Sequence, residues 1–117
     1  MADKKERNRK RKASAERKAI NSQLRKDRKN IAVEIMNVSH GICRYTDING
    51  RVLFDLEPGE IEVLSLEELT EVNNRCKGFF KKYKLIVIDV MSDEYKVEDV
   101  LGYLGVLVVF LLFLISL

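Results

Sequence analysis

The chain has 117 residues and a formal net charge of +3, with 33% charged residues, two cysteines and one histidine. One histidine, and two cysteines without C-x-x-C spacing, exclude the common structural zinc sets. The charge is unevenly distributed: residues 1–30 carry +9, from thirteen Lys and Arg against four Asp and Glu, and residues 31–117 carry −6, from eight against fourteen. We expect no disulfide and no signal peptide, because no apolar run follows the basic start.

This charge division predicts three parts. They are a basic arm (residues 1–30), a compact α/β module (residues 31–92), and an acidic linker with an apolar C-terminal helix (residues 93–117). The expected fold class is α+β, with a small antiparallel sheet and one or two packed helices, flanked by a helical or disordered arm and the apolar helix. Because so small a core is near the limit of independent stability, we expect the protein to depend on a partner.

The basic arm favours a helix by composition, since it is rich in Ala, Arg, Lys, Gln and Glu and lacks Gly and Pro. Like-charge repulsion and the shortage of apolar side chains nevertheless predict disorder in the free protein and folding upon binding. Ile20 and Leu24, one helical turn apart, would form one small contact patch.

Cations of the arm are the candidate nucleic-acid-binding residues. Neutralising phosphates with Lys and Arg releases counterions whatever the base sequence. Residues 4–29 contain no aromatic side chain to stack on bases, so we expect little sequence preference. The alternatives are an acidic protein surface, including that of another copy, or a solubilising tail. The candidate residues are Arg7, Arg9, Lys10, Arg11, Lys12, Arg17, Lys18, Arg25, Lys26, Arg28 and Lys29.

Residues 31–63 show the period of two that is typical of half-buried strands. We expect strands over 31–39, 42–46 and 51–56 and a short fourth strand marked by Ile61 and Val63. Turns separate these strands at His40-Gly41, at Asn49-Gly50, whose residues tolerate the positive φ of a tight hairpin, and at Pro58-Gly59. The residues expected to share one face are Ile31, Val33 and Ile35 in the first strand and Val52, Phe54 and Leu56 in the third.

Ser65 and Glu68 match the S-x-x-E pattern of a capping box, which predicts a helix over about residues 66–76 that ends near Gly78. Its apolar face would contain Leu66, Leu69, Val72 and Cys76. Leu85–Met91 follows as an almost continuous apolar run and predicts a buried, central strand, with Asp89 as the exception.

Residues 100–117 carry no charge and predict an apolar helix of about 27 Å, close to a hydrocarbon core of about 30 Å. Two interpretations remain, a membrane span and a helix packed in an assembly. Acidic residues before the segment, with few cations near it, weigh against the span. Tyr103 would be an interfacial aromatic in the first case and a packing residue in the second. The membrane or assembly contact residues are Val106, Leu107, Val108, Val109, Phe110, Leu111, Leu112, Phe113, Leu114 and Ile115.

The sequence contains no clear candidate for a catalytic residue. His40 lies in a predicted turn without an obvious partner, and Asp89 fits a structural role in a strand. The chain has no Gly-rich phosphate loop, HExxH or GxSxG motif. We therefore expect no catalytic residues, no metal, no cofactor and no enzyme activity.

Residues 33–104 resemble a group of small virion-associated proteins of tailed bacteriophages. The resemblance lies in VEIMNVSHG (33–41), the hairpin at Tyr45, EPGE (57–60), SLEEL (65–69), GFFKKYKLIVID (78–89) and DEYKVEDVLGYL (93–104). It implies a structural place in a phage head, neck or tail, with other virion proteins as partners and no catalytic residues to carry over. The long basic arm and the apolar end depart from that pattern.

Three functions follow as hypotheses. The first is a virion structural or assembly protein, made in the host cytoplasm, that docks by its central module and contacts nucleic acid or a neighbouring subunit through the arm. The second is a tail-anchored membrane protein held by residues 100–117. The third is a free nucleic-acid-binding regulator that acts through residues 4–29.

Overall fold

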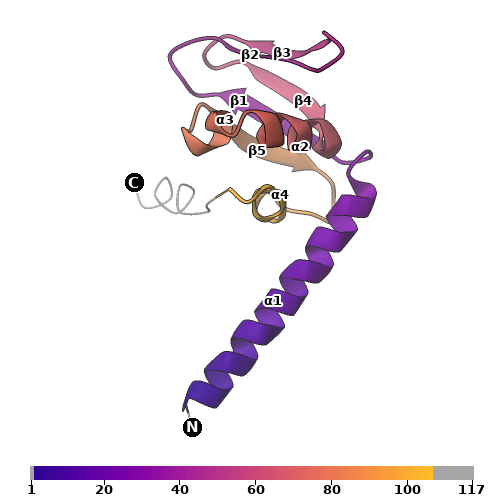
Figure 1. Ribbon diagram of the computed structural model, residues 1–117, viewed down its shortest axis with the longest axis vertical. Coiled ribbons are helices and arrows are strands. Elements are labelled where there is room, and N and C mark those ends of the chain that lie inside the picture. Colours follow the sequence, from indigo (N-terminus) through magenta and orange to yellow (C-terminus); the bar gives the residue numbers. More distant parts are fainter. Residues whose placement is uncertain (1, 107–117) are drawn as a thin grey trace.

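The computed structural model describes residues 2–106 of the chain. Helix α1 extends away from a layered body, which we define as residues 31–106 (Figure 1). Separate helices and antiparallel strands confirm the α+β class. In chain order the elements are α1 (Ala2–Asp27), β1 (Ala32–Asn37), β2 (Cys43–Thr46), β3 (Val52–Leu56), β4 (Ile61–Ser65), α2 (Leu66–Arg75), α3 (Gly78–Lys81), β5 (Leu85–Met91) and α4 (Val97–Leu104).

Strand β1 is the centre of a three-stranded antiparallel sheet with the order β4-β1-β5. Val33 of β1 is paired with Leu64 of β4 and with Val90 of β5, and all three side chains are buried on the inner face. The prediction that Leu85–Met91 is central is wrong, because among the described residues β5 pairs only with β1. The apolar run of β5 therefore does not mean that a strand pairs with it on each side. Ile86 and Ile88 are only half-buried.

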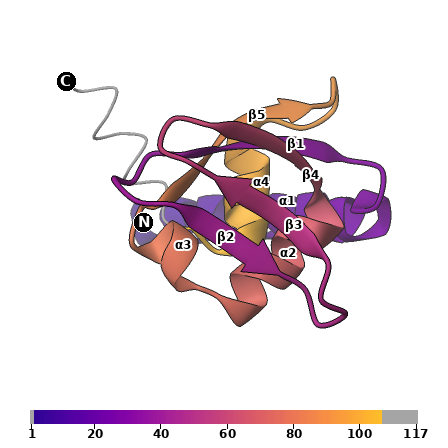
Figure 2. The same cartoon turned by 90° about the horizontal axis from the view of Figure 1, so that it is seen from above.

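Strands β2 and β3 form a separate hairpin that lies beside β4 (Figure 2). The predicted turn is present but wider than a two-residue turn. The Asp47 carboxylate accepts hydrogen bonds from the backbone N–H groups of Asn49 and Arg51, each 2.9 Å long. Gly50 supplies the positive φ, +82°. The loop therefore matches a three-residue connection closed by a left-handed glycine.

Aromatic contacts attach the hairpin to the helical layer. Tyr45 stacks on Phe54 with ring centroids 6.1 Å apart, and Phe54 meets the edge of Phe79 at 5.6 Å. Phe54 and Leu56 are buried, as their alternation predicts. Val52, predicted on the same face, is 41% exposed because it lies next to the turn at the free end of the hairpin.

Helix α2 begins with the predicted capping box. Glu68 N–H donates to the Ser65 hydroxyl, and Ser65 N–H donates to the Glu68 carboxylate. Leu66, Leu69 and Val72 are fully buried, which confirms three of the four predicted inner residues. Cys76 is exposed, because the helix ends at Arg75 and Cys76 is its non-helical cap. Both cysteines are free, and Cys43 is buried.

The basic arm is helical over 26 residues, which confirms the helical alternative of the predicted helical or disordered arm. The helix-favouring composition of the arm supplies the propensity. The last turns also have a tertiary anchor, since the Leu24 side chain has no exposed surface and belongs to the core of the body. Ile20, the other member of the predicted patch, is 38% exposed.

Helix α4 corrects the prediction of one continuous helix over residues 100–117. It starts at Val97 and ends at Leu104, where Gly105 adopts the left-handed conformation (φ 72°). Val106 N–H then donates to the carbonyl of Leu101, a bond typical of a helix end at glycine. Val100 and Leu101 are buried against the core. Residues 107–117 lie outside the described part of the chain.

Replacement of Leu24 tests whether the arm and the body share one core. Leu24→Ala should lower the free energy of unfolding by about 3 kcal/mol, because it removes a fully buried side chain and leaves a cavity. Urea unfolding followed by circular dichroism measures the loss. Ile20→Ala, one turn away and partly exposed, is the matched control and should cost less than about 1 kcal/mol. Equal effects of the two substitutions would contradict the shared core.

Candidate nucleic-acid interface

The predicted cations are concentrated on α1. Those from Arg7 to Lys26 lie on the helix, and Arg28 and Lys29 lie in the turn that follows. All of them except Arg28, which is half-buried, have exposed side chains. The two ion pairs found between residues 2–106, Arg51–Glu68 and Arg75–Glu71, do not involve the arm. The positive charge of α1 is therefore available to an external polyanion.

A hydrogen-bonded contact fixes the end of α1 to the body. The Tyr95 hydroxyl donates to the Asp27 carboxylate at 2.9 Å, and the Gln23 amide donates to the same oxygen at 3.0 Å. The hydrogen bonds from Gln23 and Tyr95 lower the pKa of Asp27, because they stabilise its charged form. Burial, followed by the hydrogen bond to Asp27, raises the pKa of Tyr95 to about 12. The contact thus joins a carboxylate to a protonated phenol.

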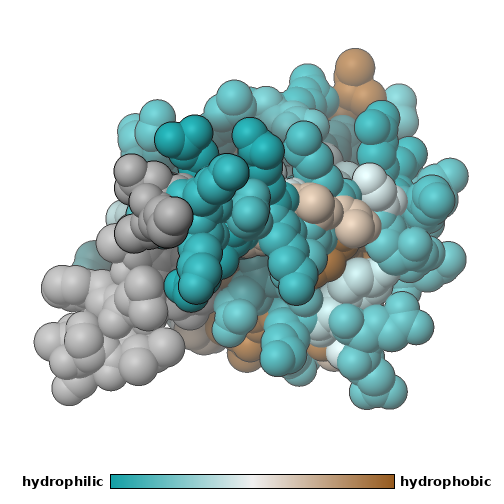
Figure 3. All heavy atoms as spheres, turned by 90° about the horizontal axis from the view of Figure 1, so that it is seen from below, coloured by the Kyte–Doolittle hydropathy of each residue, from teal (hydrophilic) through white to brown (hydrophobic). Residues whose placement is uncertain are grey.

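One stripe of cations runs along α1. Arg7 and Arg11 are one turn apart, and Lys18 and Arg25 follow at intervals of about two turns, so all four share a face of the helix. Seen from below, hydrophilic side chains dominate the side of the molecule from which α1 projects (Figure 3). A row of this kind matches a phosphate backbone, because it presents charge repeatedly along one direction.

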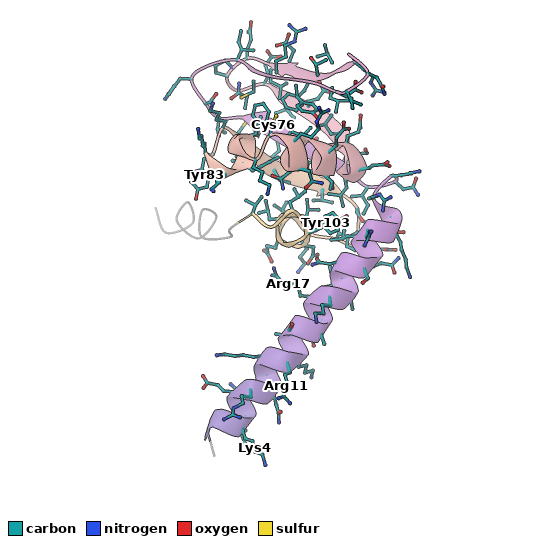
Figure 4. The ribbon with its side chains drawn as sticks, in the orientation of Figure 1. Lys4, Arg11, Arg17, Cys76, Tyr83 and Tyr103 are labelled. Carbon is teal, nitrogen blue, oxygen red and sulfur yellow. The ribbon has the colours of Figure 1, made fainter. Side chains whose placement is uncertain are left out.

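Arg17, in the second half of α1, reaches helix α4 of the body. A Cβ atom placed on Gly102 of α4 would lie 2.8 Å from Nη1 of Arg17, so the guanidinium packs directly over this glycine. Glu98 and Asp99 line the same hollow. Figure 4 shows Arg17 on α1 near α4, and Lys4 and Arg11 farther along α1, away from the body. Arg17 is therefore placed to hold α1 beside α4.

The structure brings polar and aromatic residues of the body next to the arm. Tyr103 of α4 and Asn73 and Asn74 of α2 line a hollow with Arg25 and Arg28. None of these body residues was predicted to accompany the cations. Tyr103 was noted only as an interfacial or packing aromatic, because its nearness to α1 depends on how α4 docks. Tyr103 and Arg25 are far apart in the sequence, so the sequence alone does not indicate that they lie close together.

Of the predicted apolar contact segment, residues 106–115, the structure describes only Val106. Val106 is half-buried and packs against the core. Leu107 to Ile115 lie outside the described residues. Among residues 2–106, none of the helices combines the length and the apolar character that a membrane crossing requires.

Residues considered for catalysis are exposed and separate. His40 lies in the bend before β2, and Asp89 lies in β5, where its carboxylate accepts a hydrogen bond from the backbone N–H of Val90. Within residues 2–106, no group of three or more His, Cys, Asp or Glu side chains is arranged to hold a metal ion.

Comparison with protein-family models, with curated proteins and with solved structures finds no match.

The Tyr95–Asp27 contact predicts a pH-dependent stability. Tyr95→Phe should lower the free energy of unfolding by about 1 kcal/mol, the net value of a typical hydrogen bond. The folded pKa of Tyr95, about 12, exceeds the ordinary value of 10.0, so the contribution is complete below pH 10 and is lost as the pH rises through 12. Urea titrations at several pH values measure it.

The matched control for this substitution is Tyr103→Phe. The Tyr103 hydroxyl has no hydrogen bond to residues 2–106, so this change should leave stability unaltered. If wild type and Tyr95→Phe lost stability in parallel between pH 10 and 12, the proposed role of the contact would be wrong.

Proposed function

We propose that this protein is a non-enzymatic structural or assembly protein of a bacteriophage virion, in which the body docks among other virion proteins and the arm binds nucleic acid. The observation that supports the nucleic-acid part is the projecting helix α1, whose cations are exposed and have no ion pairs with the described body. The resemblance of residues 33–104 to small virion-associated proteins supports the place in a particle.

Electrostatics favours a polyanion as the ligand of α1. Closely spaced like charges repel one another along the helix, and a phosphate backbone relieves this repulsion while its own counterions are released. A positive helix N-terminus adds to the attraction for anions at the far end of α1. The arm is also a regular helix rather than a loose tail, so the chain gives up less conformational entropy when it binds.

The body can serve as a docking module without a reactive group. Its sheet leaves Ile61, Val63 and Met91 about half exposed, with fractions of 50%, 41% and 51%. Apolar side chains that remain accessible on one sheet are a common feature of surfaces that pack against other proteins. This exposure supports attachment within an assembly, and a free regulator would not need it.

Neutral substitutions on the arm test the polyanion binding. The double variant Arg7→Gln/Arg11→Gln should bind duplex DNA more weakly, and the slope of log K against log salt should become shallower by about 2, since each lost phosphate contact contributes about 0.9. Fluorescence anisotropy with a labelled duplex at several salt concentrations measures the slope. Lys81→Gln/Lys82→Gln removes two equally exposed cations from the α3 region of the body and is the control. An unchanged slope for the arm variant would reject nucleic acid as its ligand.

Fractionation of infected cells tests the place in a particle. The protein should co-sediment with purified virions through a density gradient and remain there after nuclease treatment of free nucleic acid, because the body and not only the arm holds it. Recovery of the protein solely with host membranes would reject the virion proposal in favour of an anchored protein. Recovery solely with free nucleic acid would reject it in favour of a regulator.

A further inference from the structure

A groove lies between the last turns of α1 and helices α2 and α4. Two hollows of ≈ 460 Å³ and ≈ 410 Å³ both have Arg25 and Tyr103 in their lining, so they lie side by side on this surface, and we call the two together the groove. Both hollows are shallow and open to solvent, so they offer a surface along which an extended chain can lie rather than an enclosed pocket. The remaining lining residues are Lys18, Asn21, Ser22, Arg28, Glu67, Thr70, Asn73, Asn74 and Leu104.

The groove has an excess of positive charge. Lys18, Arg25 and Arg28 contribute three cations, and Glu67 is the one carboxylate among the lining residues. Glu67 forms no ion pair with these cations. Arg28 is held against the end of α1, because its Nη1 donates to the carbonyl of Arg25 at 2.9 Å. Three cations around a single acid make the groove attractive to phosphate groups.

Tyr103 gives the groove an aromatic wall in a fixed position. It is half-buried and packs against the core, so the body supports its ring. The Asn73 amide donates to the carbonyl of Leu104 at 2.9 Å, which fastens the end of α4 to α2 beside the ring. Asn74 is exposed, and its amide forms no hydrogen bond with residues 2–106. The groove thus combines cations, a supported aromatic ring and a free amide.

From this combination we infer that the groove binds a single-stranded nucleic acid, with one base stacked on Tyr103 and the flanking phosphates held by Lys18, Arg25 and Arg28. Only an unpaired base can present its flat face to a side chain, because both faces of a paired base are covered by its neighbours in the duplex. The free Asn74 amide can hydrogen-bond the edge of that base. The inference rests on the proposed binding of nucleic acid by the arm and specifies the form that is preferred.

The cationic stripe on α1 leads directly into this groove. Lys18 and Arg25 belong both to the stripe and to the groove, and Arg7 and Arg11 continue the same line toward the start of the helix. A strand whose backbone follows the stripe therefore reaches Tyr103 at the point where α1 meets the body. Charge along the helix contributes affinity for any polyanion, and the ring adds a preference for unpaired strands.

Substitution of Tyr103 in the full chain tests the inference, with a labelled oligo(dT) and a duplex of equal length as probes. Tyr103→Leu should weaken oligo(dT) binding by about 5- to 150-fold, the range for loss of one stacked base, and leave duplex binding unchanged. Tyr103→Phe keeps the aromatic ring and should retain wild-type affinity, which also shows that the fold tolerates change at this position. Tyr83→Leu removes an exposed tyrosine outside the groove and is the matched control.

Tyrosine fluorescence provides a second measurement, because the chain has four tyrosines and no tryptophan. Oligo(dT) should quench part of the emission in wild type, and that part should be absent in Tyr103→Leu. Equal binding of oligo(dT) by wild type and Tyr103→Leu, with duplex binding intact, would overturn the stacking site while the polyanion function of the arm stands. Failure of wild type to bind either probe would reject both proposals, with an acidic protein surface then the ligand of the arm.

Discussion

Leu24 and Asp27, one turn apart on α1, attach the helix to the body by two different forces. Leu24 is removed from water within the core, and Asp27 accepts the hydroxyl hydrogen bond of Tyr95. The first contact supplies most of the attachment energy, because burial of a leucine exceeds the net value of one hydrogen bond. The second contact is directional and sets the rotation of α1 about its axis. The cations of α1 face where they do because of this pair.

This attachment of α1 through Leu24 and Asp27 also explains why the arm, which carries a charge of +9, does not pack along the acidic body. A continuous helix cannot bend back without breaking backbone hydrogen bonds, and the anchored last turns direct the rest of α1 away from the sheet (Figure 1). Arg17 is close enough to the attached end of α1 to reach α4, where Glu98 and Asp99 line the same hollow. Farther along the helix the cations remain without acidic partners from the described body. The basic and acidic parts of the sequence therefore also lie apart in the folded protein.

Local sequence patterns predicted the elements of the body well. Ser65 and Glu68 predicted the start of α2, and the alternation of Val33 and Ile35 predicted the inner face of β1, because these signals depend on neighbours within one turn or strand. Arrangement in space was harder to predict. The apolar run Leu85–Met91 fits a central strand as well as an edge strand, and its order relative to β1 depends on contacts between distant segments.

The candidate site shows the same division between local and distant information. The cations of α1 were found from composition, but Tyr103 became part of the site only through the docking of α4 beside α1. The end of α4 was missed for another reason. Gly105 has the left-handed backbone conformation that stops a helix, yet the uninterrupted apolar residues around it favoured a longer one. Gly105 ends the helix although the apolar pattern continues past it, so the pattern alone does not show where the helix ends.

If the arm binds a polyanion as proposed, its rigid connection to the core would make α1 a spacer as well as a binding element. At about 1.5 Å per residue, Arg7 stands about 25 Å along the helix from Leu24. An unstructured tail of the same composition would let a bound strand collapse onto the protein surface or wander from it. The helix would instead hold the far part of such a ligand at a set height above the body, so that neighbouring copies in an ordered array would keep a strand at one common level.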